Sequence, residues 1–401
     1  MYSRLFAVAL LGITFLYTVG FGLDKIPPAS EWTEHGIIIP RGDPDAWDGS
    51  DAAMVIGLTM KDNVFYCYYT RGFRGCWEAE RKGSHTSIGL ATSRDGRTWE
   101  KHQDNPLMIP HDFVDVHAHE EGIRHAIIRY EPQLEKFFGY FGVEDPGGKS
   151  SCPYMQRNSC DCNISVDAYV YAAESYDGLE WVNKGLVEGV FNAEGRENYP
   201  RAYLYSDSTY YLWTMRNEGG SNGSVSSGQN PQAMDELKFG FYDWASETGE
   251  QCDAFLHDDG TTVSIIAKST DDWHKGGFRI GTSTLDDITQ VEWGDGWFPR
   301  SSGFQHGKLL KGPKEWMLVT TENDLADIVL ITAPRADIVK VKHGRRGERR
   351  RNIGVGRRQV YTLRGQTTSA KALRTRPASV YIDDRSDDCK TNDLIILGGK
   401  D

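Results

Sequence analysis

Acidic side chains stand directly before two apolar segments of this 401-residue sequence. Glu197 precedes one of them, within the string Glu197-Asn-Tyr-Pro-Arg201. The other segment begins at Ala52 and is preceded by Asp43, Asp45, Asp48 and Asp51. Carboxyl groups that reach one site from different segments can act as general acid and general base. An acidic loop can also do no more than cap a strand or bind calcium, so the elements that position these residues decide between the two readings.

One hairpin pattern occurs twice, 82 residues apart. Residues 88–100 read Ile-Gly-Leu-Ala-Thr-Ser-Arg-Asp-Gly-Arg-Thr-Trp-Glu, and residues 170–181 read Val-Tyr-Ala-Ala-Glu-Ser-Tyr-Asp-Gly-Leu-Glu-Trp. In each copy an apolar strand runs into Asp-Gly, which tolerates positive φ and favours a tight hairpin before a strand that carries Trp. A third, degraded copy begins at Arg279 and ends at Trp293. A repeat of this kind, alternating with other hairpins, predicts stacked four-stranded sheets.

Further strand pairs alternate with these copies. Four of them are 52–60 with 64–70, 123–130 with 136–141, 199–205 with 209–215, and 306–310 with 315–320. The fourth sheet, where the pattern is poorest, is assembled from Thr261–Ile266 and Phe278–Thr282. We therefore predict an all-β fold, a five-bladed β-propeller of four-stranded antiparallel sheets over residues 32–339, in which radial closure protects the sheet edges.

The blade pattern resembles that of a known group of enzymes. The string Ser87-Ile-Gly-Leu-Ala-Thr-Ser-Arg-Asp-Gly-Arg-Thr-Trp-Glu-Lys, the following Asn105-Pro106 and the Tyr-Tyr strands are similar to the five-bladed β-propeller glycoside hydrolases, the superfamily that includes families 43, 32, 62, 68 and 130. The likeness runs from Trp47 to near Val339. It implies catalytic carboxylates on the innermost strands of the first three blades, around a pocket at one end of the central channel.

The resemblance assigns roles to the acidic residues. Asp51, with Asp48 as the second choice, is similar to the superfamily's opening aspartate, which is the general base in inverting members and the nucleophile in retaining ones. Glu197 resembles the general acid, which precedes a proline at the start of a blade, and Arg201 is expected to steer it or to bind substrate hydroxyls. A cavity lined by Tyr and Trp would raise the pKa of such an acid, because desolvation disfavours its charged form.

Blade two departs from the superfamily pattern. The resemblance implies Arg-Asp-Pro at the opening of this blade, whereas the sequence has Arg124-His125-Ala126. Either Glu120 or Glu121 takes the place of the missing aspartate, or His125 does its work in altered chemistry, or the site is inactive.

Blade five opens with a histidine in the string Gly303-Phe-Gln-His306-Gly-Lys. His306 resembles a histidine that lines the channel near a structural cation in several members of the superfamily. A lone histidine is more often a hydrogen-bonded core residue. We expect no required cofactor and no catalytic metal site, and a structural Ca²⁺ remains open in view of the acidic body.

The charge is unevenly distributed. The chain has 45 Lys and Arg against 57 Asp and Glu, a net charge of −12. Residues 340–376 alone carry +12, which leaves −24 for the rest of the chain. In the basic part of residues 340–401, apolar residues do not recur at the spacing of a helix or a strand, so we expect a disordered basic tail. Its charges are either simply exposed to solvent or bind polyanions or anionic lipid. An acidic body does not fit a protein that grips nucleic-acid phosphates.

The N-terminal segment has the layout of a secretory signal peptide. Residues 1–22 hold Arg4, an apolar run from Leu5 to Tyr17 and small residues near Gly20 and Gly22. The sequence thus predicts a secreted, extracellular protein that meets a membrane only if this segment is uncleaved. Seven cysteines favour disulfide bonds in an oxidising compartment, and Asn163 and Asn222 open glycosylation sequons.

The leading hypothesis is a secreted glycoside hydrolase that acts on oligosaccharides or polysaccharides, most simply as a monomer. The partner is then a carbohydrate, and no nucleic acid is expected. A second hypothesis is a carbohydrate-binding propeller that has lost its chemistry, which the histidine at position 125 favours. A third is a glycoside phosphorylase, which would need convergent Arg, Lys and His for phosphate. No Walker loop or His-Glu-x-x-His motif occurs in the sequence.

Overall fold

The computed structural model separates into two compact units, residues 26–335 and a second unit made of residues 1–25 and 336–401. In the first unit, the described residues are 26–43, 46–49, 52–72, 87–109, 112–113, 123–145, 167–190, 198–217, 221–243, 250–268, 277–298, 305–322 and 327–335. In the second, they are Lys25 and four short strands that form two hairpins: β21 (Val360–Tyr361) with β22 (Thr367–Thr368), and β23 (Ser379–Ile382) with β24 (Leu394–Leu397). The predicted signal peptide and most of the predicted disordered tail lie outside the described residues.

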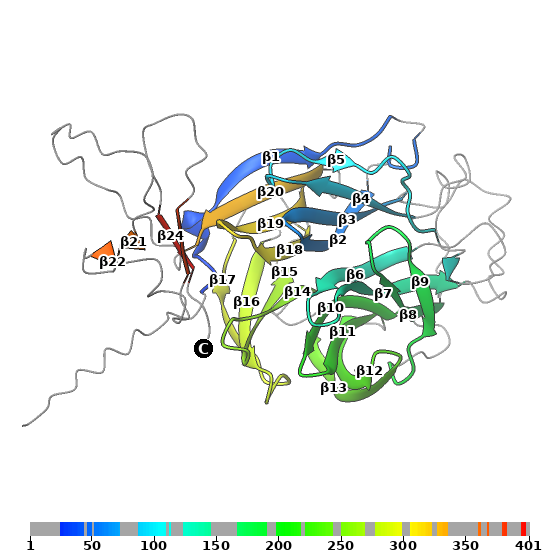
Figure 1. The fold of residues 1–401 in the computed structure, drawn as a ribbon. Coiled ribbons are helices and arrows are strands. Elements are labelled where there is room, and N and C mark those ends of the chain that lie inside the picture. The colour runs from blue at the N-terminus through cyan, green and yellow to red at the C-terminus, as the bar shows by residue number, and fades with distance from the viewer. Residues whose placement is uncertain are drawn as a thin grey trace, which may run out of the picture. The chain divides into compact units, whose positions relative to one another are not determined.

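The first unit consists of five four-stranded antiparallel sheets (Figure 1). Blade one holds β2 (Ala52–Lys61), β3 (Val64–Gly72), β4 (Ser87–Ser93) and β5 (Glu100–Lys101). Blade two holds β6 (Ile123–Glu131), β7 (Lys136–Asp145), β8 (Asp167–Ser175) and β9 (Val182–Leu186). Blade three holds β10 (Asn198–Ser206), β11 (Thr209–Asn217), β12 (Ser221–Asn230) and β13 (Ala233–Asp243).

Blade four holds β14 (Glu250–Leu256), β15 (Thr262–Lys268), β16 (Phe278–Thr284) and β17 (Glu292–Gly296). Blade five holds β18 (Gln305–Lys311), β19 (Glu315–Glu322), β20 (Asp327–Pro334) and, from the start of the chain, β1 (Thr33–Ile39). The first strands of the blades contact one another in a closed ring, in the order β2, β6, β10, β14, β18 and back to β2. The predicted five-bladed β-propeller is confirmed.

Blade four corrects one detail of the prediction. The segments expected to build it, Thr261–Ile266 and Phe278–Thr282, are its second and third strands, and the innermost strand β14 was missed. The reason is that β14 reads Glu-Gln-Cys-Asp-Ala-Phe-Leu, with Asp253 buried at 1% exposure. A buried charge in the middle of a short strand removes the apolar pattern by which a strand is recognised.

Blade five is closed by the two ends of the unit. Strand β1 pairs with β20 from Thr33 opposite Thr332 to Ile39 opposite Ile328. Because this pairing joins segments almost 300 residues apart, it ties the first blade-forming strand to the last and leaves the ring without an open joint.

The repeated turn has the same hydrogen bonds in both copies, but it is longer than the predicted tight hairpin. In blade one the Gly96 amide donates to Ser93 Oγ over 2.9 Å, and Asp95 Oδ1 accepts from the amides of Arg97 and Thr98. In blade two, Ser175, Asp177 and Gly178 repeat the arrangement. Gly96 and Gly178 have φ of 72° and 84°, the left-handed region that favours glycine.

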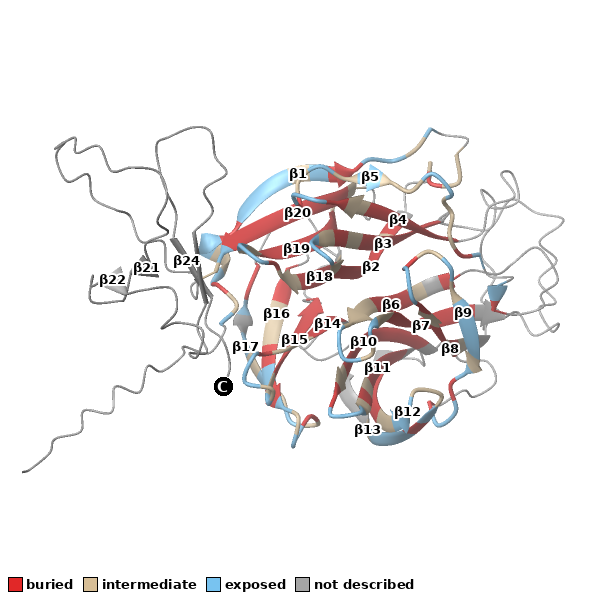
Figure 2. Ribbon diagram, in the orientation of Figure 1, coloured by how far each residue is buried: buried red, intermediate tan, exposed pale blue. Residues whose placement is uncertain are grey.

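Buried aromatic and aliphatic side chains pack between neighbouring blades. Figure 2 marks the buried residues along the strands. Tyr68 of blade one donates its hydroxyl to the Gly178 carbonyl of blade two, and Tyr203 of blade three donates to the Phe138 carbonyl of blade two. These bonds satisfy the polar end of each buried ring and fix how one blade lies against the next.

Cys67 and Cys252, the two cysteines within the described residues, are buried free thiols. The expected disulfide bonds therefore do not involve either of them, and the other five cysteines lie outside the described part of the chain. None of the described helices is long and apolar enough to cross a membrane.

Candidate functional site

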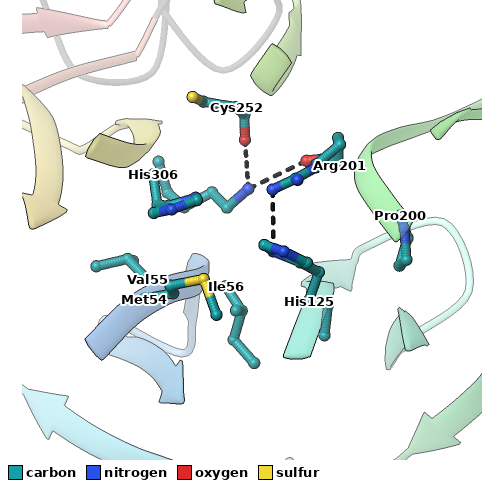
Figure 3. A pocket seen from close by; sticks show the side chains of 10 residues that line it. Met54, Val55, Ile56, His125, Pro200, Arg201, Cys252 and His306 are labelled. Carbon is teal, nitrogen blue, oxygen red and sulfur yellow. Dashed lines mark hydrogen bonds between the residues drawn. The ribbon is translucent and has the colours of Figure 1, made fainter. Parts of the chain in front are cut away.

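A pocket lies in the central channel, near the N-terminal ends of the five innermost strands (Figure 3). Every blade contributes to it, and it contains about 230 Å³ of space, part of which is open to solvent. The lining residues are Met54, Val55, Ile56, His125, Ala126, Pro200, Arg201, Cys252, His306 and Lys308. The pocket is thus the place where the ring of blades brings five distant segments together.

Each innermost strand has a β-bulge at the level of this pocket. The pairing register shifts between Val55 and Gly57 in β2, and the same irregularity recurs in the other four blades, between Ile123 and His125, Pro200 and Ala202, Gln251 and Asp253, and Gln305 and Lys308. A bulge leaves a residue unopposed and re-aims its side chain. The residues that these bulges leave unopposed on the neighbouring strand include four that line the pocket: Ile56, Arg201, Cys252 and His306.

The bulge in blade five also carries backbone strain. His306 has φ of 52°, in the left-handed region that residues other than glycine seldom adopt. Such conformations persist where the surrounding structure holds them, and they are common at binding sites. His306 lies with its ring centroid 5.7 Å from that of His125, so the strained backbone brings a second imidazole to the pocket.

Arg201 and His125 form a hydrogen bond across the boundary between blades two and three. Arg201 Nη1 lies 2.9 Å from His125 Nδ1. A guanidinium can only donate, so His125 Nδ1 accepts, and the proton of the neutral ring is on Nε2. The Tyr199 ring packs edge-on against His125 at 4.5 Å and lies beneath the Arg201 guanidinium at 5.8 Å. The Arg201 contact therefore fixes the tautomer and the orientation of the His125 ring.

Lys308 is buried below these groups, at 5% exposure. Its ammonium donates to the Arg201 carbonyl over 3.2 Å and to the Cys252 carbonyl (Figure 3). Burial lowers the pKa of Lys308 from 10.5 to about 8, with Asp253 acting in the opposite direction. At pH 7 Lys308 is still mostly a cation, and it holds blades three, four and five together around the pocket.

Asp253 is buried on the innermost strand of blade four, directly after the pocket-lining Cys252. Its Oδ1 accepts from Arg129 of blade two, and its Oδ2 accepts from the Leu309 amide of blade five over 2.8 Å. Arg129 also donates to the Ala254 carbonyl. The carboxylate thus connects three blades through charge-assisted hydrogen bonds.

Replacing Arg129 with Met is expected to lower the free energy of unfolding by about 3 to 5 kcal/mol, because it leaves the charge of Asp253 buried without its ion-pair partner. Denaturant unfolding measures the loss. The matched control is Arg97→Met, which breaks the partly exposed 2.9 Å pair with Glu315 and is expected to cost less than about 1 kcal/mol. Equal losses for the two variants would contradict the stabilising role given to the buried Arg129–Asp253 pair.

Asp48 forms an ion pair with the outermost strand of blade one. Its side chain is buried, and its Oδ2 accepts from Lys101 Nζ at 2.6 Å, on the outermost strand of blade one. The neighbouring Trp47 stacks on Tyr69 at 5.7 Å. Asp48 thus anchors the acidic segment to the outer part of blade one.

The other predicted residues fall into two groups. His125, Arg201 and His306 meet at the pocket, as the resemblance implied for channel-lining residues. Arg124 is the bulged residue of β6, and nothing is described of its side chain. Asp51, Glu121 and Glu197 lie outside the described residues; Asp51 directly precedes β2 and Glu197 directly precedes β10.

Sequence reasoning did not select Lys308 or Cys252. Lys308 stands two residues after His306 in the string Gly303-Phe-Gln-His306-Gly-Lys308. Alternate residues of a strand lie on the same face, so this spacing could have identified Lys308 as a residue of the same site. Cys252 lies on the strand that was missed altogether. Among the described residues there is no group of three or more His, Cys, Asp or Glu side chains that could hold a metal ion.

Comparison with known proteins gives matches in structure alone. No protein-family model matches the sequence, and no curated protein matches it. A glycosyl hydrolase from Bacteroides ovatus superposes with a TM-score of 0.51 at 10% identity, over 77% of this chain and 96% of that one. The chain shares its fold with five-bladed β-propeller glycoside hydrolases.

Two further structures show the same propeller fold. A family 117 glycoside hydrolase from the marine bacterium Zobellia galactanivorans has a TM-score of 0.50 and 12% identity, over 77% of this chain and 92% of that one. The other belongs to family 130, a family of mannoside phosphorylases that contains glycoside hydrolases targeting β-1,2-mannosidic linkages in Candida mannan. It has a TM-score of 0.50 and 10% identity, over 78% and 97% of the two chains.

A partly buried carboxyl, that of Glu131, lies at the opposite end of the innermost strand of blade two. Burial raises the pKa of Glu131 from 4.5 to about 7, while Arg129 and the Tyr203 hydroxyl act in the opposite direction. The pocket is lined by His125 and Ala126, near the start of β6, whereas Glu131 is the last residue of this strand. Glu131 is therefore not part of the candidate site.

Glu131 makes the stability of the propeller depend on pH. The folded protein keeps this proton up to about pH 7, whereas the unfolded chain loses it near pH 4.5. Its contribution to the free energy of unfolding is complete below pH 4.5 and decreases as the pH rises to about 7. Urea unfolding at several pH values between 4.5 and about 7 measures this dependence. The free energy of unfolding should decrease less with rising pH in Glu131→Gln than in wild type, or not at all. Glu180→Gln, at an exposed position, is the control and should behave as wild type.

Proposed function

We propose that the protein is a secreted glycoside hydrolase, with its active site at the end of the channel where the innermost strands begin. One observation carries the proposal: residues near the start of all five innermost strands line a single pocket. In the sequence, Asp51 and Glu197 directly precede β2 and β10, the innermost strands of blades one and three, which supports their assignment to this site. The shared fold with glycoside hydrolases supports the same reading.

The two carboxyl groups divide the reaction between them. Glu197 is the general acid, which protonates the oxygen of the leaving sugar as the glycosidic bond breaks. Asp51 acts on the opposite side, either by attacking the anomeric carbon or by activating a water molecule. We favour Asp51 over Asp48 for this role because Asp48 is paired with Lys101.

His125 takes part as a donor rather than as a base. The hydrogen bond from Arg201 keeps its Nδ1 unprotonated, so Nε2–H can donate to a sugar oxygen. The superfamily aspartate that His125 replaces would accept from a sugar hydroxyl, so the exchange reverses the direction of this hydrogen bond. The substitution accordingly changes which substrates fit and does not by itself remove the acid and base.

A substrate screen tests the proposal. Purified protein is incubated with aryl glycosides and oligosaccharides of neutral and acidic sugars, and released phenol or reducing ends are measured. The proposal expects turnover of at least one glycoside and its loss in Glu197→Gln. Saturable binding of a sugar by calorimetry, with no turnover by wild type, would instead identify a carbohydrate-binding propeller.

A further inference from the structure

Lys308 links three of the five β-bulges that surround the pocket. It directly follows the bulge of blade five, where the strand pairing shifts between Gln305 and Lys308. Its ammonium donates to the carbonyls of Arg201 and Cys252 (Figure 3). These two are the residues that the strand pairing skips at the bulges of blades three and four. One side chain beside a bulge thus hydrogen-bonds to the backbone of two others.

The two hydrogen bonds bear on the geometry of the bulges. A bulge interrupts the regular ladder of hydrogen bonds between two strands, so its backbone is held in part by other groups. A buried carbonyl is stabilised by a donor, and a charged donor forms the stronger bond. An ammonium has three N–H groups, which is enough to serve both carbonyls at once. Lys308 therefore favours one backbone geometry at each of the two bulges.

The contacts between blades four and five hold Lys308 itself in place. The next residue, Leu309, donates its amide to Asp253 Oδ2 over 2.8 Å, which ties β18 to β14 one residue further along each strand. The Leu309 side chain packs with Cys252 in the core between these two blades. Lys308 is 5% exposed, so its side chain has little freedom to turn away. The ammonium thus approaches both carbonyls from a fixed position.

The bulge of blade three sets the direction of Arg201. Arg201 Nη1 lies 2.9 Å from His125 Nδ1, and the guanidinium lies over the Tyr199 ring at 5.8 Å. A shift of the backbone at Arg201 would move the guanidinium relative to His125, whose tautomer depends on this contact. Lys308 therefore influences the pocket through Arg201, in addition to its own place in the lining.

We propose that Lys308 is a positioning residue of the channel pocket, which holds the bulges at Arg201 and Cys252 in register and orients His125 through Arg201. This inference rests on the proposed function, because the residues that Lys308 orients are those assigned to the sugar. Two of its tests need no turnover, so the inference and the proposed function can fail separately.

Thiol labelling tests the bulge of blade four. Cys252 and Cys67 are both buried free thiols, and Cys67 lies in the core between blades one and five. Native protein is treated with iodoacetamide, and mass spectrometry follows the alkylation of each cysteine. In Lys308→Met, Cys252 should react about 10-fold to 100-fold faster than in wild type, because two charge-assisted hydrogen bonds are lost, whereas Cys67 should react at its wild-type rate. Lys136→Met, which breaks a pair with Glu174 within blade two, is the control and should leave the ratio of the two rates unchanged.

The sign of the labelling change separates opening of the bulge from a direct effect of charge. Lys308 and Cys252 interact electrostatically. Loss of the Lys308 charge disfavours the Cys252 thiolate and would by itself slow alkylation. Faster alkylation of Cys252 therefore reports a change in the backbone around it.

Histidine NMR tests the effect on Arg201 and His125. In wild type the His125 ring should carry its proton on Nε2 alone, and His125→Gln identifies the signal. In Lys308→Met the proton should be shared between the two ring nitrogens, since Arg201 no longer holds Nδ1 unprotonated. For a glycoside that wild type turns over, Lys308→Met should raise KM and leave kcat within a few-fold, because the general acid and the blade-one carboxylate are unchanged.

Either of two results in folded Lys308→Met would overturn the inference. One is that the rates for Cys252 and Cys67 change by the same factor or not at all, and the other is that His125 keeps its wild-type tautomer. If Lys308→Met does not fold, as judged by circular dichroism, Lys308→Gln decides by the same two measurements, with smaller changes because it keeps an N–H donor. Both expected changes together with absent turnover in wild type would instead contradict only the proposed hydrolase activity.

Discussion

Glu197→Gln is expected to lower kcat for an unactivated glycoside by about 10²-fold to 10⁴-fold, the range that a general acid contributes. Glutamine keeps the size and the hydrogen-bonding capacity of the side chain but has no proton to transfer. Binding of the substrate should therefore remain within a few-fold of wild type. Steady-state kinetics gives the loss of turnover, and calorimetry with the same glycoside gives the affinity.

The leaving group provides an internal control for this variant. A dinitrophenyl leaving group needs little protonation, so Glu197→Gln should lose much less activity on a dinitrophenyl glycoside than on the alkyl glycoside of the same sugar. An equal loss on both substrates would mean that Glu197 supports the fold or the binding of the sugar and does not donate the proton.

Asp51→Asn is expected to abolish turnover on both kinds of substrate, with a loss of at least about 10³-fold. Its carboxylate is needed whatever the leaving group, because it attacks the sugar or activates water. Asp51→Asn should therefore be inactive on the dinitrophenyl glycoside as well, whereas Glu197→Gln should keep much of its activity on that substrate. Initial rates on the same two glycosides measure the difference.

Asp48→Asn is the matched control for Asp51→Asn. Asp48 is buried and paired with Lys101 at 2.6 Å, so we expect a loss of about 1 to 3 kcal/mol of stability and little change in turnover by the folded protein. Lys101→Met should cost a similar amount, because it breaks the same pair. If Asp48→Asn abolishes turnover and Asp51→Asn does not, the roles of the two aspartates are exchanged.

The fold was largely predictable because its signals are local. The repeated turn at Ser93 and Ser175 lies within a few residues of chain, and the apolar strand pairs are separated by short turns. Strand β14 was hidden by Asp253, whose charge is neutralised by Arg129 from another blade. The closure of blade five by β1 depends on residues almost 300 positions away, and nothing in the local pattern indicates that partner.

The candidate site was predictable in part. His125, Arg201 and His306 were selected by their place at the start of a blade, and they do line one pocket. The bulges that aim side chains into it are properties of strand register, which two neighbouring strands fix together and a single sequence does not reveal. The pairing of Asp48 with Lys101 likewise joins residues 53 positions apart, and no local pattern indicates it.

The distance between the carboxyl groups of Asp51 and Glu197 tests the central claim most directly. A crystal structure that includes both residues, ideally with a sugar bound, would measure it. We predict that the two groups face each other across the channel at about 5 to 10 Å, near 5 Å for a retaining enzyme and larger for an inverting one. Carboxyl groups that point away from the channel, or that lie too far apart to contact one sugar ring, would contradict the hydrolase.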